Sequence, residues 1–165
     1  MGYRPRMRQT LPDLGPRGEG WVALQFVIFG AIFGGGLIGG TWTGPYRLAA
    51  AALGVALMAV GGWLALRGLF DLRESLTVFP RPREGARLIQ QGSYGLVRHP
   101  IYGGLVLGGL GWGLAAAAPV SLAASLLLAG FFDLKSRREE AWLEERFAGY
   151  AAYRARTRKL IPWVY

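Results

Sequence analysis

The sequence predicts an all-α integral membrane protein with about four transmembrane helices, the last two forming a tight hairpin, and a cytoplasmic amphipathic C-terminal helix. Three observations lead to this fold class. The 165 residues are 52% hydrophobic and only 18% charged, whereas soluble domains average about 25% charged residues. The hydrophobic residues are gathered in four long blocks. The basic residues lie almost entirely between those blocks.

The composition also excludes several classes of function. The chain has no cysteine and one histidine, which excludes a disulfide framework, a cysteine nucleophile and thiolate or multi-histidine metal sites. We therefore expect no bound metal. A net charge of +9 can indicate nucleic-acid binding, but here the basic residues separate apolar blocks. Membrane topology explains that arrangement better, and we expect no nucleic-acid partner.

The first two blocks have the length of membrane spans. Trp21–Gly40 is an uncharged run of 20 residues, and about 20 helical residues cross the roughly 30 Å hydrocarbon core. A signal peptide has a shorter apolar core of about 7–15 residues, so we expect a retained span. Leu48–Phe70 is the second span. Its one charge, Arg67, lies near its end, where a long side chain can reach the lipid headgroups.

The last two blocks form the expected hairpin. Ile101–Ala118 is uncharged, and Pro119–Phe132 follows it directly. At 1.5 Å per residue the fourth block covers about 21 Å, which is less than the full hydrocarbon core. We therefore expect a tight hairpin that stops short of the far side of the membrane.

Glycines are abundant in the blocks, and pairs of them lie four residues apart. Small residues at this spacing let helix backbones approach closely in lipid, which is the simpler interpretation. For Gly103 and Gly104, the alternative is close approach of the backbone to a ligand. The pairs are Gly30 and Gly34, Gly36 and Gly40, Gly104 and Gly108, and Gly109 and Gly113.

The basic residues predict the orientation in the membrane. Four lie in the first 20 residues, one between the first two blocks, five in residues 71–100, none in the hairpin turn and eight in residues 133–159. Cytoplasmic loops carry an excess of Lys and Arg. Four spans therefore place both termini and residues 71–100 in the cytoplasm. The abundance of Ala, Gly, Leu and Arg suggests a bacterial source, so we expect a multi-pass inner-membrane protein surrounded by membrane lipids.

The tail after the fourth block is densely charged but carries an apolar face. Leu143, Phe147 and Tyr150 fall at positions i, i+4 and i+7 of an amphipathic helix. No Gly or Pro interrupts residues 132–147. One helix could therefore leave the membrane and continue into the cytosol.

The clearest candidate site precedes the third block, where Arg98-His99-Pro100 runs into it. Proline suits the first turn of a helix, so Arg98 and His99 flank a helix N-terminus. Backbone N–H groups, the helix dipole and these side chains together favour a carboxylate or a phosphate. The plainer interpretation is that Arg98 binds lipid phosphate and that Tyr94 and Tyr102 are interfacial anchors.

A second group of charges lies where the fourth block meets the tail. Adjacent Glu139 and Glu140 are about 100° apart on a helix, so at most one of them faces a given pocket squarely. The alternative is a solvated face of ion pairs, which stabilise a helix little. The basic members of the group are Lys135, Arg137 and Arg138.

These residues match a family signature. Residues 92–104 resemble the pattern G-x-Y-x-x-x-R-H-P-x-Y-x-G of the isoprenylcysteine carboxyl methyltransferase and phospholipid methyltransferase superfamily. Its second half, E-E-x-x-L-x-x-x-F, is matched by Glu139, Glu140, Leu143 and Phe147. Pro80-Arg81-Pro82 and Leu88-Ile89 also look like the bacterial members. The resemblance covers about residues 70–165.

The resemblance implies an integral-membrane enzyme that uses S-adenosylmethionine to methylate a lipophilic carboxylate, thiol or amine at the cytoplasmic face. The apolar blocks divide the chain into an N-terminal segment over 1–20 and one membrane domain over 21–165, and the resemblance places the cofactor-binding half at about 70–165. It implies catalytic roles for Arg98, His99 and Glu140, with Glu140 rather than Glu139 facing the cofactor. The implied cofactor-binding residues are Leu88, Tyr94, Arg98, His99, Pro100, Tyr102, Gly103, Gly104, Glu139 and Glu140. The implied substrate-binding residues are Lys135, Arg138 and Tyr153.

Two other functions fit less well. Membrane sterol reductases share part of this architecture and bind NADPH at a similar cytoplasmic site, but the chain is short for their larger set of helices. A non-catalytic membrane protein could also keep the signature for packing alone. Binding of S-adenosylmethionine, of NADPH or of neither separates the three functions.

The distribution of basic residues makes a prediction about topology. Reporter fusions at Tyr165 and within residues 41–45 should report inside and outside locations, respectively, because the positive-inside rule places the richly basic connections in the cytoplasm. An external reporter at Tyr165 would contradict the four-span arrangement and the predicted location of the site.

Overall fold

The fold is all-α over the described part of the chain, as predicted. The computed structural model describes residues 11–165, apart from positions 39, 41, 76–78, 80 and 82–84. The predicted contributions of Arg4, Arg6, Arg8, Pro80 and Pro82 lie outside the described residues. The elements are α1 (Glu19–Leu37), α2 (Arg47–Leu72), the short 3₁₀ helix η1 (Arg73–Ser75), α3 (Ser93–Leu96), α4 (Pro100–Ala115), α5 (Pro119–Arg146) and α6 (Tyr150–Arg156).

The four predicted blocks each form a helix. Three helices, α1, α2 and α5, are long and apolar enough to cross a membrane, and α4 is a shorter apolar helix of 16 residues. The apolar part of α5 ends at Phe132, and the helix continues without a break to Arg146. We call residues 133–146 the polar extension of α5. Its continuity agrees with the absence of Gly and Pro there.

The predicted amphipathic helix of the tail is divided in two. The helix α5 ends when Phe147 adopts an extended conformation, and α6 begins after Gly149. The spacing of Leu143, Phe147 and Tyr150 was therefore wrong as evidence for one continuous helix. The break lies next to Gly149, because glycine has a low helix propensity and this residue comes three positions after the last residue of α5.

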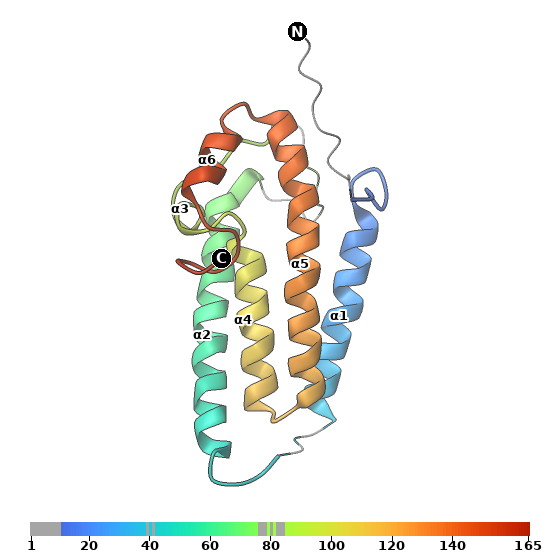
Figure 1. Ribbon diagram of the computed structural model, residues 1–165, viewed down its shortest axis with the longest axis vertical. Helices are drawn as coiled ribbons and strands as arrows, with labels where there is room; N and C mark the ends of the chain where they lie inside the picture. The colour runs from blue at the N-terminus through green and yellow to red at the C-terminus, as the bar shows by residue number, and fades with distance from the viewer. Residues whose placement is uncertain (1–10, 39, 41, 76–78, 80, 82–84) are drawn as a thin grey trace.

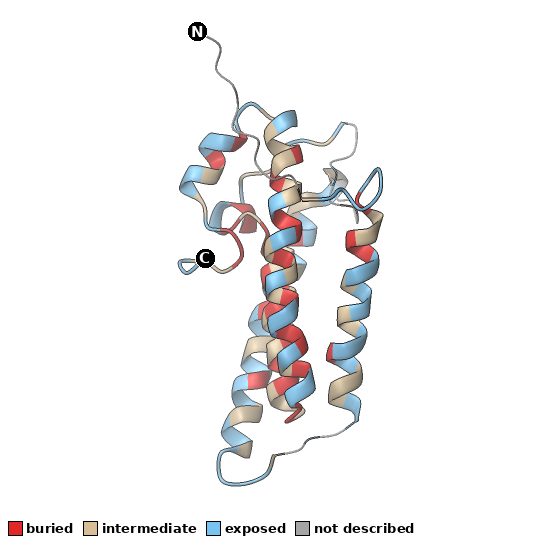
Figure 2. Cartoon of the chain, turned by 45° about the vertical axis from the view of Figure 1, so that its right-hand side comes forward, coloured by how far each residue is buried: buried red, intermediate tan, exposed pale blue. Residues whose placement is uncertain are grey.

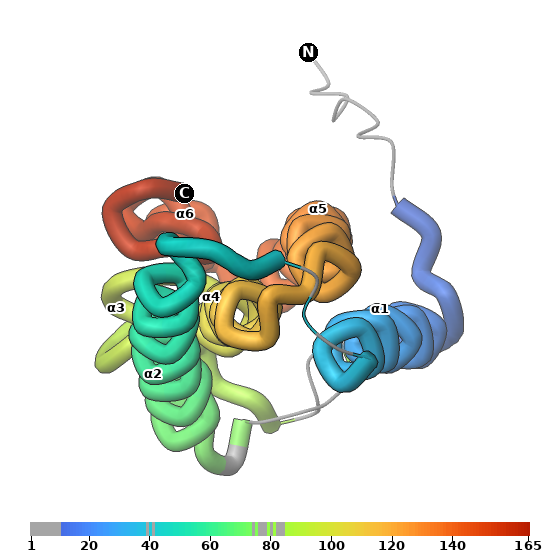
Figure 3. Tube along the Cα trace, turned by 90° about the horizontal axis from the view of Figure 1, so that it is seen from below, coloured from blue at the N-terminus to red at the C-terminus, as the bar shows by residue number. Residues whose placement is uncertain are grey.

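The helices form a bundle with α4 in the middle. Figures 1 and 3 show α4 between α2 and α5, with α1 beside α5, and the contacts agree. Within the described residues α1 makes no contact with α2. A small core around Ile32, Val106, Leu128 and Phe132 joins α1, α4 and α5. Figure 2 shows that the outer faces of α1 and α2 are largely exposed, which suits helices surrounded by lipid.

The two ends of the bundle differ in chemistry. One end, which we call the polar end, carries α3, α6 and the polar extension of α5 (Figure 1). The opposite end carries the α1–α2 connection and the α4–α5 turn. The side chain of Arg47, the first residue of α2, donates to the carbonyl of Ala115 at 2.7 Å. It thereby satisfies a free carbonyl at the C-terminus of α4.

The helices α2 and α4 pack backbone against backbone. A Cβ atom at Gly61 would lie 2.5 Å from the carbonyl oxygen of Gly104, and one at Gly54 would lie 2.5 Å from that of Gly111. Added Cβ atoms at Gly104 and Gly111 would lie equally close to the backbone of α2. Glycine is required at such a contact because any larger residue would push the helices apart.

The predicted glycine pairs are confirmed only in part. Gly36, Gly40, Gly104, Gly109 and Gly113 lie against neighbouring segments. The prediction was wrong for Gly30 and Gly34, where nothing lies within 4 Å of an added Cβ atom, whereas the backbone N of Gly108 would lie 2.8 Å from a Cβ atom at Gly61. Spacing alone does not indicate which side of a helix meets a neighbour.

The segment before α4 is held from two sides. The Asp71 carboxylate at the end of α2 accepts hydrogen bonds from the backbone N–H and the hydroxyl of Ser93, both at 2.7 Å. The tail returns alongside, so that Arg98 N–H donates to the carbonyl of Arg158 at 2.8 Å and His99 N–H to that of Lys159 at 3.0 Å. Pro100 then begins α4, as predicted.

The α2–α4 contact makes a prediction with a control one residue away. Gly61→Ala should lower the thermal midpoint of the purified protein in detergent, since overpacking of a close contact costs about 1–3 kcal/mol. Gly62→Ala should have no effect or raise the midpoint, because nothing lies within 4 Å of its added Cβ and alanine favours helix. Equal melting of the two variants would contradict the backbone contact.

Candidate functional site

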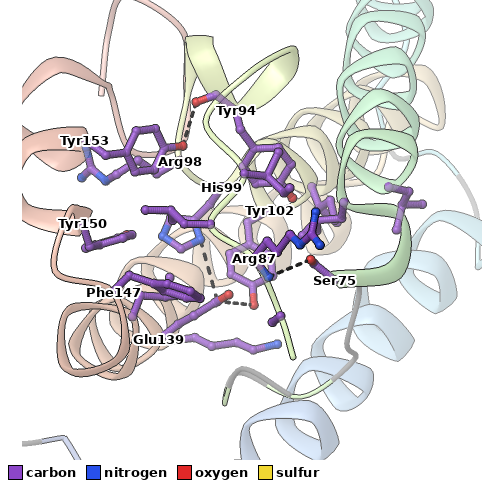
Figure 4. A pocket seen from close by; sticks show the side chains of 18 of the residues that line it. Ser75, Arg87, Tyr94, Arg98, His99, Tyr102, Glu139, Phe147, Tyr150 and Tyr153 are labelled. Carbon is purple, nitrogen blue, oxygen red and sulfur yellow. Dashed lines mark hydrogen bonds and ion pairs between the residues drawn. The ribbon is translucent and has the colours of Figure 1, made fainter. Parts of the chain in front are cut away.

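A cavity of about 280 Å³ opens at the polar end between α2, α4, the polar extension of α5 and α6 (Figure 4). This volume is close to the lower end of small-molecule sites, roughly 300–1,000 Å³. We call it the first cavity. Eight residues predicted for the site line it, namely Leu88, Tyr94, Arg98, His99, Tyr102, Lys135, Glu139 and Tyr153.

Five predicted residues lie elsewhere, and one of them, Glu140, is described below. Pro100 is buried as the first residue of α4, and Gly103 faces the backbone of Leu160. Gly104 faces the backbone of α2. These glycines allow close approach of other chain segments, so the predicted approach to a ligand is corrected. Arg138 pairs with Asp13, away from the first cavity.

The two adjacent glutamates have different surroundings, as their angular separation predicted. Glu139 lines the first cavity, where its carboxylate accepts a hydrogen bond from the Tyr102 hydroxyl at 2.9 Å. The Glu140 side chain is only 5% exposed and contacts Arg98 Nε at 2.8 Å and His99 Nε2 at 3.1 Å. Glu139 therefore lines the first cavity, whereas Glu140, which the resemblance places toward the cofactor, does not.

Arg98 joins three segments of the polar end. Besides Glu140, its guanidinium donates to the backbone carbonyls of Arg154, at 3.2 Å, and Thr157. These carbonyls belong to α6 and to the turn that follows it. Most of the donors of Arg98 are thus engaged within the protein, although the residue also lines the first cavity.

The contacts of Glu140 keep its carboxylate ionised. Burial alone raises the pKa of Glu140, but hydrogen bonds and positive charge from His99 and Arg98 outweigh it and lower the pKa to about 2. Because an ionised carboxylate only accepts hydrogen bonds, His99 Nε2 carries the proton in this contact. The other ring nitrogen, Nδ1, lies 3.8 Å from Glu139 on the cavity side.

Aromatic rings form one wall of the first cavity. The Tyr102 ring stacks between His99, with centroids 5.4 Å apart, and Phe132, with centroids 4.4 Å apart. The Lys135 ammonium lies 4.9 Å from the centre of the Tyr102 ring and donates to Gln25 Oε1 at 2.6 Å. The wall therefore presents a cation beside stacked aromatic faces, which is a cation–π arrangement.

The two tyrosines of α6 differ in their hydrogen bonds. The Tyr153 hydroxyl donates to the backbone carbonyl of Tyr94 at 2.7 Å and so ties α6 to α3. The Tyr150 hydroxyl is buried and has no partner within the described residues, although Tyr150 lines the first cavity. Burial raises the pKa of Tyr150, so its hydroxyl stays a neutral donor. An unpaired buried donor costs about 1–3 kcal/mol, and a ligand could remove this cost.

Several lining residues were not predicted for the site. Leu143, Phe147 and Tyr150 were identified as an apolar face, but their contact with a ligand space was not inferred. Gln25 could have been identified from the sequence as a candidate, because it is a polar residue within an uncharged span. Arg87 was counted only toward topology, and the sequence around it carries no further signal.

The first cavity therefore combines one carboxylate, a free hydroxyl, the cations Arg87 and Lys135, and aromatic faces. This set suits a small ligand that carries both signs of charge and a flat ring. Among the residues the structure describes, no group of three or more His, Cys, Asp or Glu side chains could hold a metal ion.

Comparison with known proteins gives two matches. The sequence model of the phospholipid methyltransferase family matches residues 49–149, from the start of α2 to the end of α5. The chain is also 33% identical over 147 residues to the cobalt-zinc-cadmium resistance protein CzcN of Cupriavidus metallidurans. That alignment covers 86% of this chain and 61% of the relative, so the chain spans less than two thirds of the relative's length.

The different surroundings of the two glutamates predict different effects on stability. Glu140→Gln should lower the thermal midpoint in detergent strongly, because removing one partner of a buried ion pair costs about 3–5 kcal/mol. Glu139→Gln should melt close to wild type, since Glu139 is about one quarter exposed and has only weak ionic contact. Similar melting of both variants would contradict the burial assigned to Glu140.

Proposed function

This chain belongs to the phospholipid methyltransferase family, and on that premise we propose that it transfers a methyl group from S-adenosylmethionine to a lipophilic acceptor at the cytoplasmic face of a membrane. The family supports a membrane methyltransferase. One observation carries the finer proposal. The Glu139 carboxylate and the unpaired Tyr150 hydroxyl line the same cavity, beside stacked aromatic rings.

The groups present in the first cavity fit this cofactor. S-adenosylmethionine carries an ammonium, a carboxylate, a sulfonium, a ribose diol and an adenine ring. Glu139 would bind the ammonium or the diol, and Arg87 or Lys135 would bind the carboxylate through charge-assisted hydrogen bonds. Tyr94 offers a flat face to the adenine, and the Tyr150 hydroxyl would gain the partner that it lacks.

The protein contributes mainly position and a dry environment. When bound, the cofactor supplies a methyl carbon that is already activated by the sulfonium. A carboxylate or thiolate acceptor then needs no general base, and correct orientation can supply up to about 7–11 kcal/mol of the acceleration. The stacked Tyr102 and Phe132 rings exclude water from one side of the cavity.

An amine acceptor has one further requirement, because it must lose a proton. His99 suits this step, because its Nε2 contacts Glu140, its Nδ1 faces the cavity, and Nδ1 accepts a proton when the ring is neutral. His99 is therefore the residue that we assign to proton transfer. Arg98 and Glu140 position it.

The acceptor would reach the first cavity from the lipid. Gln25 of α1 and Leu69 of α2 both line the cavity, and the described backbones of these helices do not approach each other closely. A lipophilic chain can therefore lie between α1 and α2 while its polar end meets Lys135. We keep Lys135 and Tyr153 as substrate contacts and exclude Arg138, which lies away from the cavity.

The proposal predicts that removing the charge of Glu139 weakens the binding of S-adenosylmethionine. Glu139→Gln should weaken binding of S-adenosylmethionine to the purified protein by roughly ten- to a hundredfold, since a hydrogen bond to a charged group contributes about 1.5–3 kcal/mol. Glu145→Gln is the matched control, because Glu145 is exposed on the same helix and lies outside the cavity. Isothermal titration with S-adenosylmethionine and with NADPH measures both affinities.

The same protein, supplied with cofactor labelled on the methyl group, should transfer the label to a lipid-soluble product in liposomes. Binding of NADPH instead would favour the reductase function, and binding of neither compound would favour a non-catalytic membrane protein. Equal affinity of Glu139→Gln and wild type for S-adenosylmethionine would remove Glu139 from the cofactor site.

A further inference from the structure

A second, larger cavity of about 660 Å³ lies at the polar end, and the proposed function does not use it. Its walls come from the polar extension of α5, the turn after α6, the chain end near Tyr165 and the segment around Leu11. Arg98 lines both cavities, whereas Glu140 lines only the second. The two cavities are thus separated by the ion pair that joins these residues.

The walls of the second cavity are strongly basic. Six basic and two acidic side chains line it, which gives a net charge of 6 − 2 = +4. Like charges at this density repel one another, so an anion would lower the electrostatic energy of the cavity. The basic residues are Arg98, Arg137, Arg138, Arg154, Arg158 and Lys159, and the acidic ones are Glu140 and Glu144.

Two of these cations are available to a ligand. The side chain of Arg158 is exposed and has no hydrogen bond or ion pair within the described residues. The Arg137 side chain is 60% exposed; it pairs through one nitrogen with Asp133, which also binds Lys159, and it interacts with the Tyr165 hydroxyl. The others are more fully engaged, as Arg98 and Arg154 are with glutamates and Arg138 is with Asp13. Arg137 and Arg158 therefore present free donors to the cavity.

The rim of the second cavity is apolar. Val164 and Tyr165 line it and are 73% and 50% exposed, and the neighbouring Trp163 is 82% exposed. The chain that leads to them passes the first turn of α4, where Leu160 lies against Gly103. Exposed Trp and Tyr side chains are typical of the lipid–water interface. These side chains favour a position of the cavity near the lipid headgroups.

An apolar stripe on α5 leads from the membrane to the same cavity. Leu127, Leu134 and Arg137 are seven and three residues apart, so they lie on one side of the helix. Both leucines are exposed, and Leu134 lines the second cavity together with Arg137. A molecule with an apolar chain and an anionic end would match this order of side chains.

We propose that the second cavity binds the phosphodiester headgroup of an anionic membrane phospholipid, with Arg137 and Arg158 as its phosphate ligands and an acyl chain along Leu127 and Leu134. Charge complementarity selects an anion. The exposed apolar rim and the stripe on α5 select a lipid over a soluble phosphate. This lipid is distinct from the methyl acceptor, and the assignment does not depend on the methyltransferase activity.

Lipid retention by the full-length protein tests the proposal. The purified protein is titrated with phosphatidylglycerol or with phosphatidylcholine in detergent micelles, and the bound lipid is counted by native mass spectrometry. The double variant Arg137→Gln/Arg158→Gln should bind phosphatidylglycerol roughly 25-fold more weakly, about fivefold for each basic residue. Arg146→Gln is the matched control, since Arg146 is exposed on the same helix and lines neither cavity.

The expected result is tighter binding of phosphatidylglycerol than of phosphatidylcholine, a loss in the double variant and none in the control. Equal binding of the two lipids, or an unchanged double variant, would overturn the proposal. Displacement of phosphatidylglycerol by millimolar inorganic phosphate would assign the cavity to a soluble anion instead. Arg158→Gln alone keeps the test valid if the double variant melts early, because the Arg158 side chain has no partner to lose within the described residues.

Discussion

The buried ion pair between Arg98 and Glu140 is the interaction on which the polar end of the protein depends. It joins the segment before α4 to the polar extension of α5, and the same guanidinium holds α6 through two backbone carbonyls. Burying two charges is costly unless their partners are complete, and here His99 and Arg154 complete the surroundings of Glu140. The pair also fixes the His99 ring, which stacks on Tyr102 and so shapes the first cavity.

The bundle beneath this end has two kinds of packing. Glycines bring α2 and α4 into backbone contact, whereas side chains such as Phe132 fill the space between α4 and α5. Because α4 lies directly against α2, the position of the start of α4 along the bundle axis is fixed relative to the end of α2. Asp71 at that end then holds Ser93. The close helix contact thus determines where the residues before α4 can stand.

Sequence reasoning identified the parts of the site but not their orientation. Arg98-His99-Pro100 at a helix start, the paired glutamates and the continuous helix after Phe132 could all be predicted, because they follow from local rules and a recognised signature. The direction of each glutamate could not, since spacing gives the angle between two side chains but not which one meets a neighbour. Gln25 and Arg87 depend on how distant segments pack, and glycine spacing was misleading at Gly30 and Gly34 for the same reason.

The pairing of residues 97–99 with residues 158–159 has a consequence for the order of assembly during synthesis. These partners lie on opposite sides of the α4–α5 hairpin in the chain, so they can meet only after both of its helices have been made and inserted. Contacts between residues far apart in sequence form late, since the intervening chain must be closed into a loop first. A growing chain that already displays His99 therefore lacks α6 and the Glu140 carboxylate, and the walls of the first cavity are complete only once the tail has returned.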